Sequence, residues 1–227
     1  MIMQALERRR ALVEASLSGL IALVLSLAVF GPILRWIAVG WSGGDMLSTY
    51  INVEMWQGFR YSVSDQYGFP LGMNLNYFPG IDITENTFAA LVSTVAGTPF
   101  VGLNILILIT FPLVGFLAYF LFRMTGLTGP LAIAGAVVFS LIPFHFGRAL
   151  GHTYLATLYS AVTGMALVLL VGSGRFERIV QQLRGRALPR SRKIWLAAAI
   201  CVLVVITAWS GVYYAAFTLL LGAAALL

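Results

Sequence analysis

Hydrophobic positions in this chain gather into six long runs, separated by short polar segments and by one long one. A helix needs about 20 apolar residues to cross a hydrocarbon layer of about 30 Å, and most of these runs approach that length. In lipid the backbone must satisfy its own hydrogen bonds, so such runs become helices. The pattern predicts an all-α, polytopic membrane protein that forms one module over residues 1–227. Its six transmembrane helices are expected at approximately 15–34, 101–122, 130–147, 154–172, 194–209 and 212–227.

The composition agrees with a membrane protein and excludes other classes. Hydrophobic residues make up 60% of the 227 residues and charged residues only 10%, whereas a soluble domain carries about 25% charged residues. A water-soluble globule, a disordered chain and a disulfide scaffold are therefore excluded. The single cysteine, Cys201, lies inside an apolar run and has no intramolecular disulfide partner.

The basic residues are distributed unevenly along the chain. Of the 14, three lie in or next to the segments expected on one side of the membrane, namely Arg35, Arg60 and Arg148, and the other 11 lie in 1–14, 123–129 and 173–193. Segments rich in Lys and Arg stay in the cytoplasm. We therefore expect a cytoplasmic N-terminus. The bias also explains the net charge of +6 without nucleic acid.

The connection at residues 40–99 is much longer than the others and is expected on the outer face. It holds five of the eight acids, Asp45, Glu54, Asp65, Asp82 and Glu85, together with ten aromatic residues. Loops of this length are usually functional or disordered, and aromatic residues argue against disorder. We predict an ordered outer loop with two short amphipathic helices in the membrane interface, one starting at Asp45 and one near Asp82.

The second of these helices begins with a recognisable pattern. Asp82 followed three residues later by Glu85 resembles a capping box, in which the two side chains bind the first free N–H groups of the helix. An apolar face follows, formed by Phe88, Leu91, Val92 and Val95.

The first of these helices carries a polar stripe of possible functional importance. Asp45, Ser48, Thr49 and Asn52 fall on one arc, which Trp56 and Phe59 continue. Asp45 can cap the helix, act as a base or hold a metal ion. Trp56 and Phe59 can anchor the helix in the interface or pack against a ligand.

The turn expected between the third and fourth membrane helices is a second candidate site. In a helix, His145, Arg148 and His152 would share one face, at i, i+3 and i+7. A guanidinium group suits phosphate recognition, and Arg148 runs against the charge bias of its side. The two histidines are poorly spaced for zinc, so packing and phosphate binding are favoured over a metal pair.

These features resemble the GT-C superfamily of polytopic glycosyltransferases. The resemblance lies in the cytoplasmic N-terminus, the first membrane helix and the long outer loop with two interfacial helices. It extends to the segments Gly43-Gly44-Asp45, Pro70-x-Gly72-x-Asn74, Gly151-His152 and Tyr213-Tyr214. It covers nearly all of this chain but only part of a typical member. The last apolar run reaches Leu227 without a polar anchor, so we expect a fragment or an N-terminal module.

The resemblance implies transfer of a sugar from a polyprenyl-phosphate carrier to a glycan, lipid or protein acceptor, on the outer face of a bacterial inner membrane. Asp45 would be the catalytic base, or would hold a divalent metal such as Mg²⁺ or Mn²⁺. Arg148, with His145 or His152, would bind the carrier phosphate. Asn52, Trp56 and Phe59 would line the substrate site.

Two other functions remain open from the sequence. The first is a polytopic transporter or lipid-carrier flippase, although such proteins usually carry ionisable residues within their membrane helices and show internal repeats. The second is a non-catalytic membrane subunit. P-loop, G-x-G-x-x-G and H-E-x-x-H motifs are absent from the sequence, so no soluble-enzyme constellation competes with these interpretations.

Overall fold

The computed structural model describes residues 2–41, 46–57, 63–64, 70–74, 82–185 and 188–226. In chain order the elements are α1 (Ile2–Leu34), α2 (Met46–Gln57), β1 (Val63–Ser64), β2 (Met73–Asn74), α3 (Ile83–Ala96), α4 (Pro99–Met124), α5 (Gly129–Ser140), α6 (Pro143–Gly151), η2 (Thr153–Ala156), α7 (Leu158–Gly172), α8 (Arg175–Arg184), α9 (Arg190–Trp209) and α10 (Val212–Ala224). The two strands form a two-residue antiparallel pair, so the helical class is confirmed.

Fewer helices can cross a membrane than the hydropathy pattern suggests. Four described segments are long and apolar enough, Glu7–Leu34, Pro99–Met124, Gly129–Gly151 and Arg190–Trp209. A fifth is possible if α7 and α8, which are bent by 79° from one another, form one broken span. The predicted span at 154–172 is shortened because η2 precedes α7. The predicted span at 212–227 contains only the 13-residue helix α10.

Helix α1 begins earlier than predicted. The predicted first span starts near Ala15, whereas the helix runs from Ile2 without a break. The added segment is rich in residues with high helix propensity, and Arg10 bridges to Glu14 one turn later at 2.7 Å. This ion pair supports the helix locally. The basic residues at the start of the chain therefore belong to the first helix.

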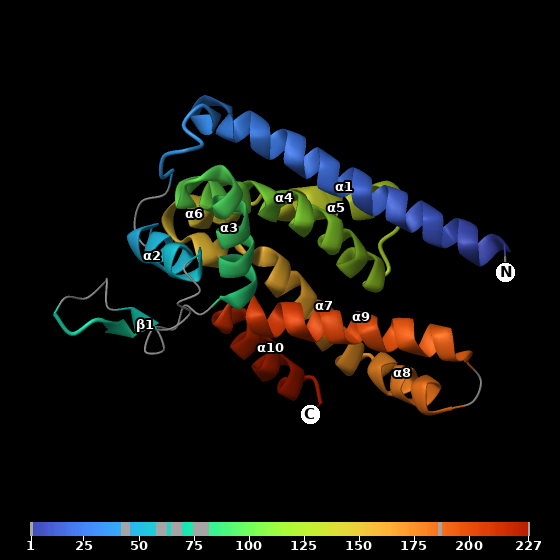
Figure 1. Ribbon diagram of the computed structural model, residues 1–227. Coiled ribbons are helices and arrows are strands. Elements are labelled where there is room, and N and C mark those ends of the chain that lie inside the picture. The colour runs from blue at the N-terminus through green and yellow to red at the C-terminus, as the bar shows by residue number, and fades with distance from the viewer. Residues whose placement is uncertain are drawn as a thin grey trace.

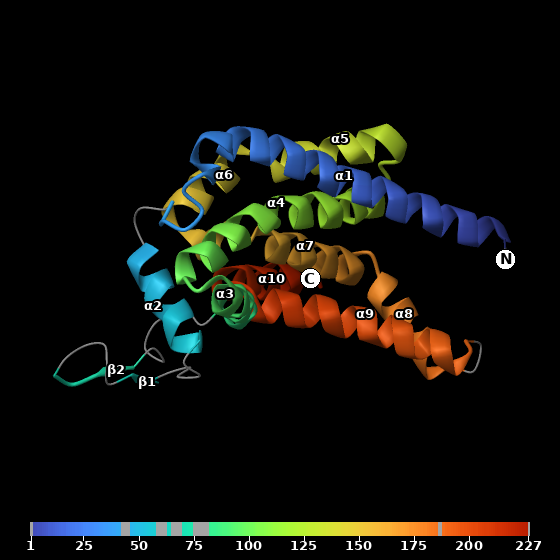
Figure 2. The same cartoon turned by 45° about the horizontal axis from the view of Figure 1, so that its top comes forward.

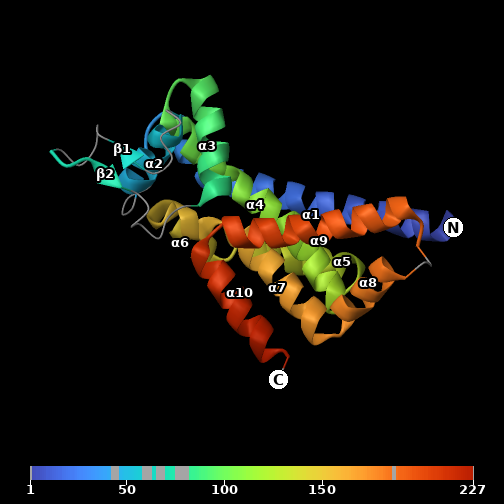
Figure 3. The ribbon, with the colours of Figure 1, turned by 60° about the horizontal axis from the view of Figure 1, so that its bottom comes forward.

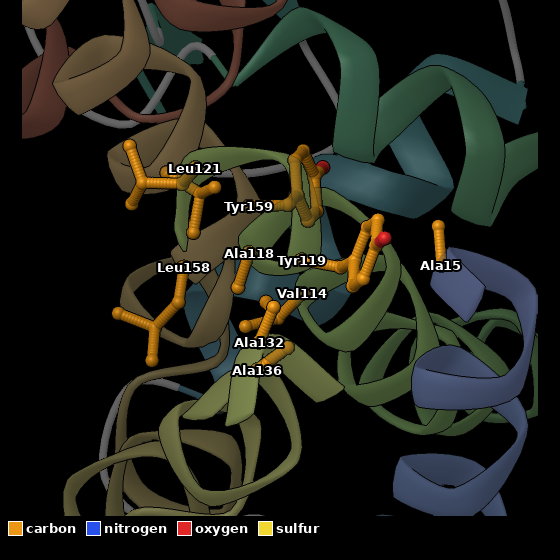
Figure 4. Close-up of a cluster of buried hydrophobic side chains, with 10 residues drawn as sticks. Ala15, Val114, Ala118, Tyr119, Leu121, Ala132, Ala136, Leu158 and Tyr159 are labelled. Atoms are coloured by element: carbon orange, nitrogen blue, oxygen red, sulfur yellow. The ribbon is translucent and has the colours of Figure 1, made fainter. Parts of the chain in front are cut away.

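Helix α4 is the centre of the bundle and packs against α1, α3, α5 and α7. Small residues permit the close approach of α1. A Cβ atom on Gly19 would lie 2.9 Å from the Pro112 carbonyl oxygen, and one on Gly115 would lie 3.0 Å from the Ala22 side chain. Membrane helices commonly use small residues at such crossings. Figure 4 shows the adjoining core, in which Val114, Ala118 and Tyr119 of α4 lie among side chains from α1, α5 and α7.

The two ends of the bundle differ in character. One end, called the basic end, contains the starts of α1 and α9, the turn between α4 and α5, and α8 (Figures 1 and 2). The other, called the acidic end, contains α2, α3, α6 and the turn between α9 and α10 (Figures 1 and 3). The helices of the 40–99 segment therefore lie far from the basic residues of α1 and α8.

Helices α2 and α3 both bury polar residues, and α3 also exposes large apolar ones. On α2, Thr49 and Asn52 of the predicted polar stripe are buried. On α3, Glu85 and Asn86 are buried, whereas Val95 of the predicted apolar face is 91% exposed. The buried sides of both helices thus carry polar residues among apolar ones, since Val53 of α2 and Ala89 of α3 are also buried, and only α3 exposes large apolar side chains. That these helices lie in a membrane interface remains a prediction.

Candidate functional site

A buried polar cluster occupies the acidic end, where α2, α3, η2, α7 and the α9–α10 turn meet. Its centre consists of two carboxyl groups, one on α3 and one on the residue that precedes α3. The other members are two amides, two phenols and one hydroxyl. We call the acidic cluster the set formed by Asp82, Glu85, Asn86, Asn52, Tyr154, Tyr159 and Ser210. All the members except Tyr154 are buried, and Tyr154 is half-buried.

Glu85 lies at the centre of the acidic cluster and is completely buried. The Tyr159 hydroxyl on α7 donates a hydrogen bond to Glu85 Oε1. The Ser210 hydroxyl lies close enough to lower the pKa of Glu85. Within the described part of the chain, however, neither Glu85 Oε2 nor Ser210 Oγ has a partner at hydrogen-bonding geometry. A buried oxygen without a partner costs free energy, and this cost is smaller when the carboxyl group holds a proton.

Asp82 does not cap its own helix, which corrects the predicted capping box. It occupies the N-cap position of α3, but its side chain makes no capping hydrogen bond there. Its Oδ1 instead accepts a hydrogen bond of 2.8 Å from the Gly211 backbone N–H, and the Val212 N–H also interacts with the carboxyl group. These N–H groups stand at the start of α10, where a helix attracts negative charge. Asp82 therefore joins α3 to α10.

The amide groups connect α2 to the same cluster. The Tyr154 hydroxyl donates to Asn86 Oδ1 and also interacts with the Asn52 side chain. Burial raises the pKa of Tyr154 above its ordinary value, so this phenol stays neutral and remains a donor. Asn52, predicted from the sequence as a substrate-binding residue, is thus brought beside the two acids by its contact with η2.

The surroundings make both carboxyl groups hold protons more tightly than usual. Burial, helped by the charge of Asp82 and opposed by the Tyr159 hydroxyl, raises the pKa of Glu85 to about 7. Burial raises the pKa of Asp82 to about 6, against the effect of the Gly211 and Val212 N–H groups. Carboxyl groups that titrate near neutral pH can exchange protons during function. Because the two interact, they titrate as a pair.

The predicted residues of the first outer helix differ in what can be said of them. Asp45 and Phe59 lie outside the described residues, and Met46 begins α2 directly after Asp45 in the chain. Trp56 is half-buried and packs against the cluster of Val53, Ala89, Ala90, Leu103 and Leu106. Its position agrees with a packing role and does not test a contact with substrate.

The predicted group of His145, Arg148 and His152 does not present one common surface. His145 is 0% exposed and stacks on Phe111, with ring centroids 3.9 Å apart. Its Nδ1 lies 2.7 Å from the Ser140 carbonyl oxygen and its Nε2 lies 3.0 Å from Thr110 Oγ1. This enclosure disfavours the predicted contact with a phosphate and favours packing.

Arg148 and His152 are more accessible. The Arg148 guanidinium lies 5.0 Å above the centre of the Phe144 ring, and it is half-buried at the acidic end. Within the described residues it forms no ion pair. His152 follows α6 as its C-cap residue, outside helical geometry. The predicted helical face therefore ends before His152, but Arg148 keeps a charge available for a ligand.

Sequence reasoning missed the buried centre of this site. It interpreted Asp82 and Glu85 as caps and gave no role to Tyr159 or Ser210. A signal was present, because Glu85 lies in the first turn of a helix whose later residues are mostly apolar. The partners of Glu85, however, come from segments distant along the chain and cannot be found from local spacing.

Comparisons with known proteins provide no further assignment. No family model matches the chain, and no significant match was found to a curated protein or to a solved structure.

Proposed function

We propose that this protein is a membrane glycosyltransferase, or the N-terminal portion of one, which transfers a sugar from a polyprenyl-phosphate carrier on the outer face of a bacterial inner membrane. The observation that carries the proposal is the meeting of distant segments at the acidic end. Helix α2, which directly follows Asp45, packs on η2, and η2 packs on α6, which bears Arg148. The helix that follows Asp45 in the chain and the helix that bears Arg148 thus both pack on η2.

The separation of charge supports the proposed orientation. The arginines of α1 and α8 gather at the basic end, whereas Asp82 and Glu85 lie at the other (Figure 1). Positively charged segments stay in the cytoplasm. The acidic end would then face outward, where lipid-linked sugars meet their acceptors. This topology agrees with the resemblance drawn from the sequence.

In the proposed reaction Asp45 takes a proton from the acceptor hydroxyl as that oxygen bonds to the anomeric carbon. The bond from that carbon to the phosphate oxygen breaks, and polyprenyl phosphate leaves. Arg148 would stabilise the leaving phosphate through charge-assisted hydrogen bonds. Trp56 and Phe59 would pack against the sugar or prenyl chain. Because Glu85 is enclosed, we assign the acidic cluster a positioning role, in which it fixes α2 and α10.

The described residues provide little support for a resident metal ion. They contain no group of three or more His, Cys, Asp or Glu side chains that could hold one. Divalent cations such as Mg²⁺ and Mn²⁺ prefer several oxygen ligands. Asp45 lies outside the described residues, so a divalent metal held by it stays a prediction from the sequence, and the proposed reaction assigns Asp45 the role of base.

The test is sugar transfer by the full-length protein in proteoliposomes supplied with a polyprenyl-phosphate sugar and an acceptor extract. Release of polyprenyl phosphate is the readout. Asp45→Asn should lower the rate by about 10²–10⁴-fold, the usual contribution of a general base. Glu177→Gln changes an exposed acid on α8 and should have no effect. Wild-type turnover in Asp45→Asn would remove the main support for the proposal.

One observation favours a second function, proton-coupled transport or flipping of a lipid carrier. Asp82 and Glu85 are buried acids that titrate near neutral pH, as the proton-binding residues of transporters do. The discriminating measurement is movement of a labelled polyprenyl-phosphate sugar across proteoliposomes with and without a pH gradient. Gradient-dependent movement without sugar transfer would favour the transporter.

A further inference from the structure

A cavity of about 460 Å³ opens at the basic end, away from the acidic cluster. It lies between α1, the end of α4 and the start of α5. Its charged and polar lining includes Glu7, Arg10, Glu14, Tyr119, Arg123 and Thr128. Nothing in the proposed glycosyltransferase reaction uses these residues.

The position of the cavity relates it to a membrane surface. The candidate span Glu7–Leu34 begins at the cavity, Pro99–Met124 ends one residue beyond Arg123, and Gly129–Gly151 begins there. Three helices that can cross a bilayer thus share this boundary. The headgroups of lipids lie at the ends of such helices, so the cavity stands at the depth where headgroup phosphates are found.

The deepest charge in the cavity is already neutralised. Arg10 Nε donates to Glu14 Oε1 at 2.7 Å, and the Tyr119 hydroxyl donates to Glu14 Oε2 at 2.5 Å. Figure 4 shows the Tyr119 hydroxyl directed from α4 toward α1 beside Ala15. Both oxygens of Glu14 are therefore occupied, and Arg10 is balanced by it. Neither group leaves an uncompensated charge for a ligand.

Two charges of opposite sign remain at the cavity. Within the described part of the chain, neither Glu7 nor Arg123 forms a side-chain hydrogen bond or an ion pair, and Arg123 acts on Glu14 and Tyr119 only through its charge. Arg123 stands beside the first residues of α5, whose N-cap residue Thr128 makes no side-chain capping bond. The free N–H groups at a helix start attract phosphate, and an arginine strengthens that attraction. Glu7 would instead attract a cation.

We propose that this cavity binds the headgroup of a zwitterionic aminophospholipid, with its phosphate on Arg123 and its ammonium on Glu7. A lining with one positive and one negative side chain that make no hydrogen bond or ion pair of their own complements a headgroup that carries both charges. An anionic headgroup would leave Glu7 facing negative charge, and a free phosphate ion would leave it without a partner. The lipid would join α1 to the α4–α5 turn in the inner leaflet.

Native mass spectrometry of the full chain, released from detergent with added phosphatidylethanolamine or phosphatidylglycerol, tests the proposal. We expect wild-type protein to retain phosphatidylethanolamine in preference to phosphatidylglycerol. Arg123→Gln should weaken this binding about tenfold, the effect of losing one hydrogen-bonded charge. Arg184→Gln removes an equally basic residue from α8, outside the cavity, and should leave binding unchanged.

Three results would overturn the assignment. They are an equal or greater retention of phosphatidylglycerol, a loss with Arg184→Gln as large as with Arg123→Gln, or complete displacement of the lipid by millimolar inorganic phosphate. Thermal unfolding of each variant checks that it is folded. If Arg123→Gln fails this check, Glu7→Gln provides the same test through the ammonium group, with Glu177→Gln as its control.

Discussion

The Asp82 carboxylate accepts a hydrogen bond of 2.8 Å from the Gly211 N–H, 129 positions further along the chain. Through this contact the residue before α3 stabilises the start of α10. The adjacent Glu85 binds Tyr159 of α7, so two acids one helical turn apart hold α3 against two other helices. The stability of this end of the bundle should therefore change with the protonation state of the two carboxyl groups.

The pair should make the stability of the protein depend on pH. The pKa of Asp82 is raised to about 6 and that of Glu85 to about 7, so the folded state binds protons more tightly than the unfolded state. Their contribution is fully present below about pH 4 and is lost as the pH rises through 6 and 7. Each group should contribute about 1–3 kcal/mol across that window.

Thermal unfolding in detergent between about pH 4 and pH 8 measures this dependence. We expect the midpoint to fall toward pH 8 for the wild type. Glu85→Gln should flatten the curve, because the amide does not titrate. Glu177→Gln, on the exposed surface of α8, should keep the wild-type slope. A wild-type midpoint that rises toward pH 8 would contradict the assignment.

The contact between α3 and α4 should be intolerant of a single methyl group. A Cβ atom on Gly102 would lie 2.2 Å from the Ala89 carbonyl oxygen, and backbone atoms cannot move aside without shifting α3. Gly102→Ala should therefore lower the free energy of unfolding by about 1–3 kcal/mol. A Cβ atom on Gly147 of α6 would meet no other atom within 4 Å, and Gly147→Ala should stabilise the helix by about 0.5–1 kcal/mol. Unfolding by urea or heat measures the change in stability of each variant and distinguishes the expected loss from the expected gain.

The two ends of the bundle should be accessible from opposite sides of the membrane. With the native Cys201 replaced by Ser, a cysteine at Ser64 of β1 should react with an impermeant reagent added outside intact cells. A cysteine at Ser191 of α9 should react only after the membrane is opened. Labelling of both positions from one side would reverse the proposed orientation and remove the acidic cluster from the outer face.

Arg148 provides the test of the proposed carrier site. Arg148→Lys keeps the charge but loses the planar fork of donors, so it should weaken binding of a polyprenyl phosphate less than Arg148→Ala does. The alanine variant should bind about tenfold more weakly. Microscale thermophoresis with the carrier measures both. Unchanged affinity in a folded Arg148→Ala protein would leave this residue with only its contact to Phe144.

The helices could be predicted from the sequence wherever a long apolar run is enough to determine a helix. Leu103 and Val114 belong to a long apolar run, and α4 covers it. The start of α1 was harder to predict. Arg10 and Glu14 are charged, so the hydropathy pattern places the beginning of the helix after them. In the folded chain their mutual ion pair and Tyr119 keep them within the helix. The polarity of neighbouring residues in the sequence does not show that charged groups will be paired in the folded chain.

The site was less predictable than the fold. Asp82 and Glu85 have the spacing of a capping box, and local rules assign them to their own helix. Their observed partners, Gly211 and Tyr159, are 129 and 74 positions away. Only the hydrogen bonds to α7 and to the start of α10, which form in the folded chain, decide between the two arrangements. His145 shows the same limit, since its enclosure by Phe111 cannot be inferred from its place on α6.

The burial of polar residues on α3 also constrains the order of synthesis. Glu85 leaves the ribosome long before Tyr159 and Ser210, and at about 5–20 residues per second Ser210 follows several seconds later. During that interval the carboxylate has no protein partner and would be costly to place in hydrocarbon. The hydrogen bond that holds Glu85 can therefore form only after α7 has been made. Segments synthesised later thus complete a part of the molecule that was made earlier.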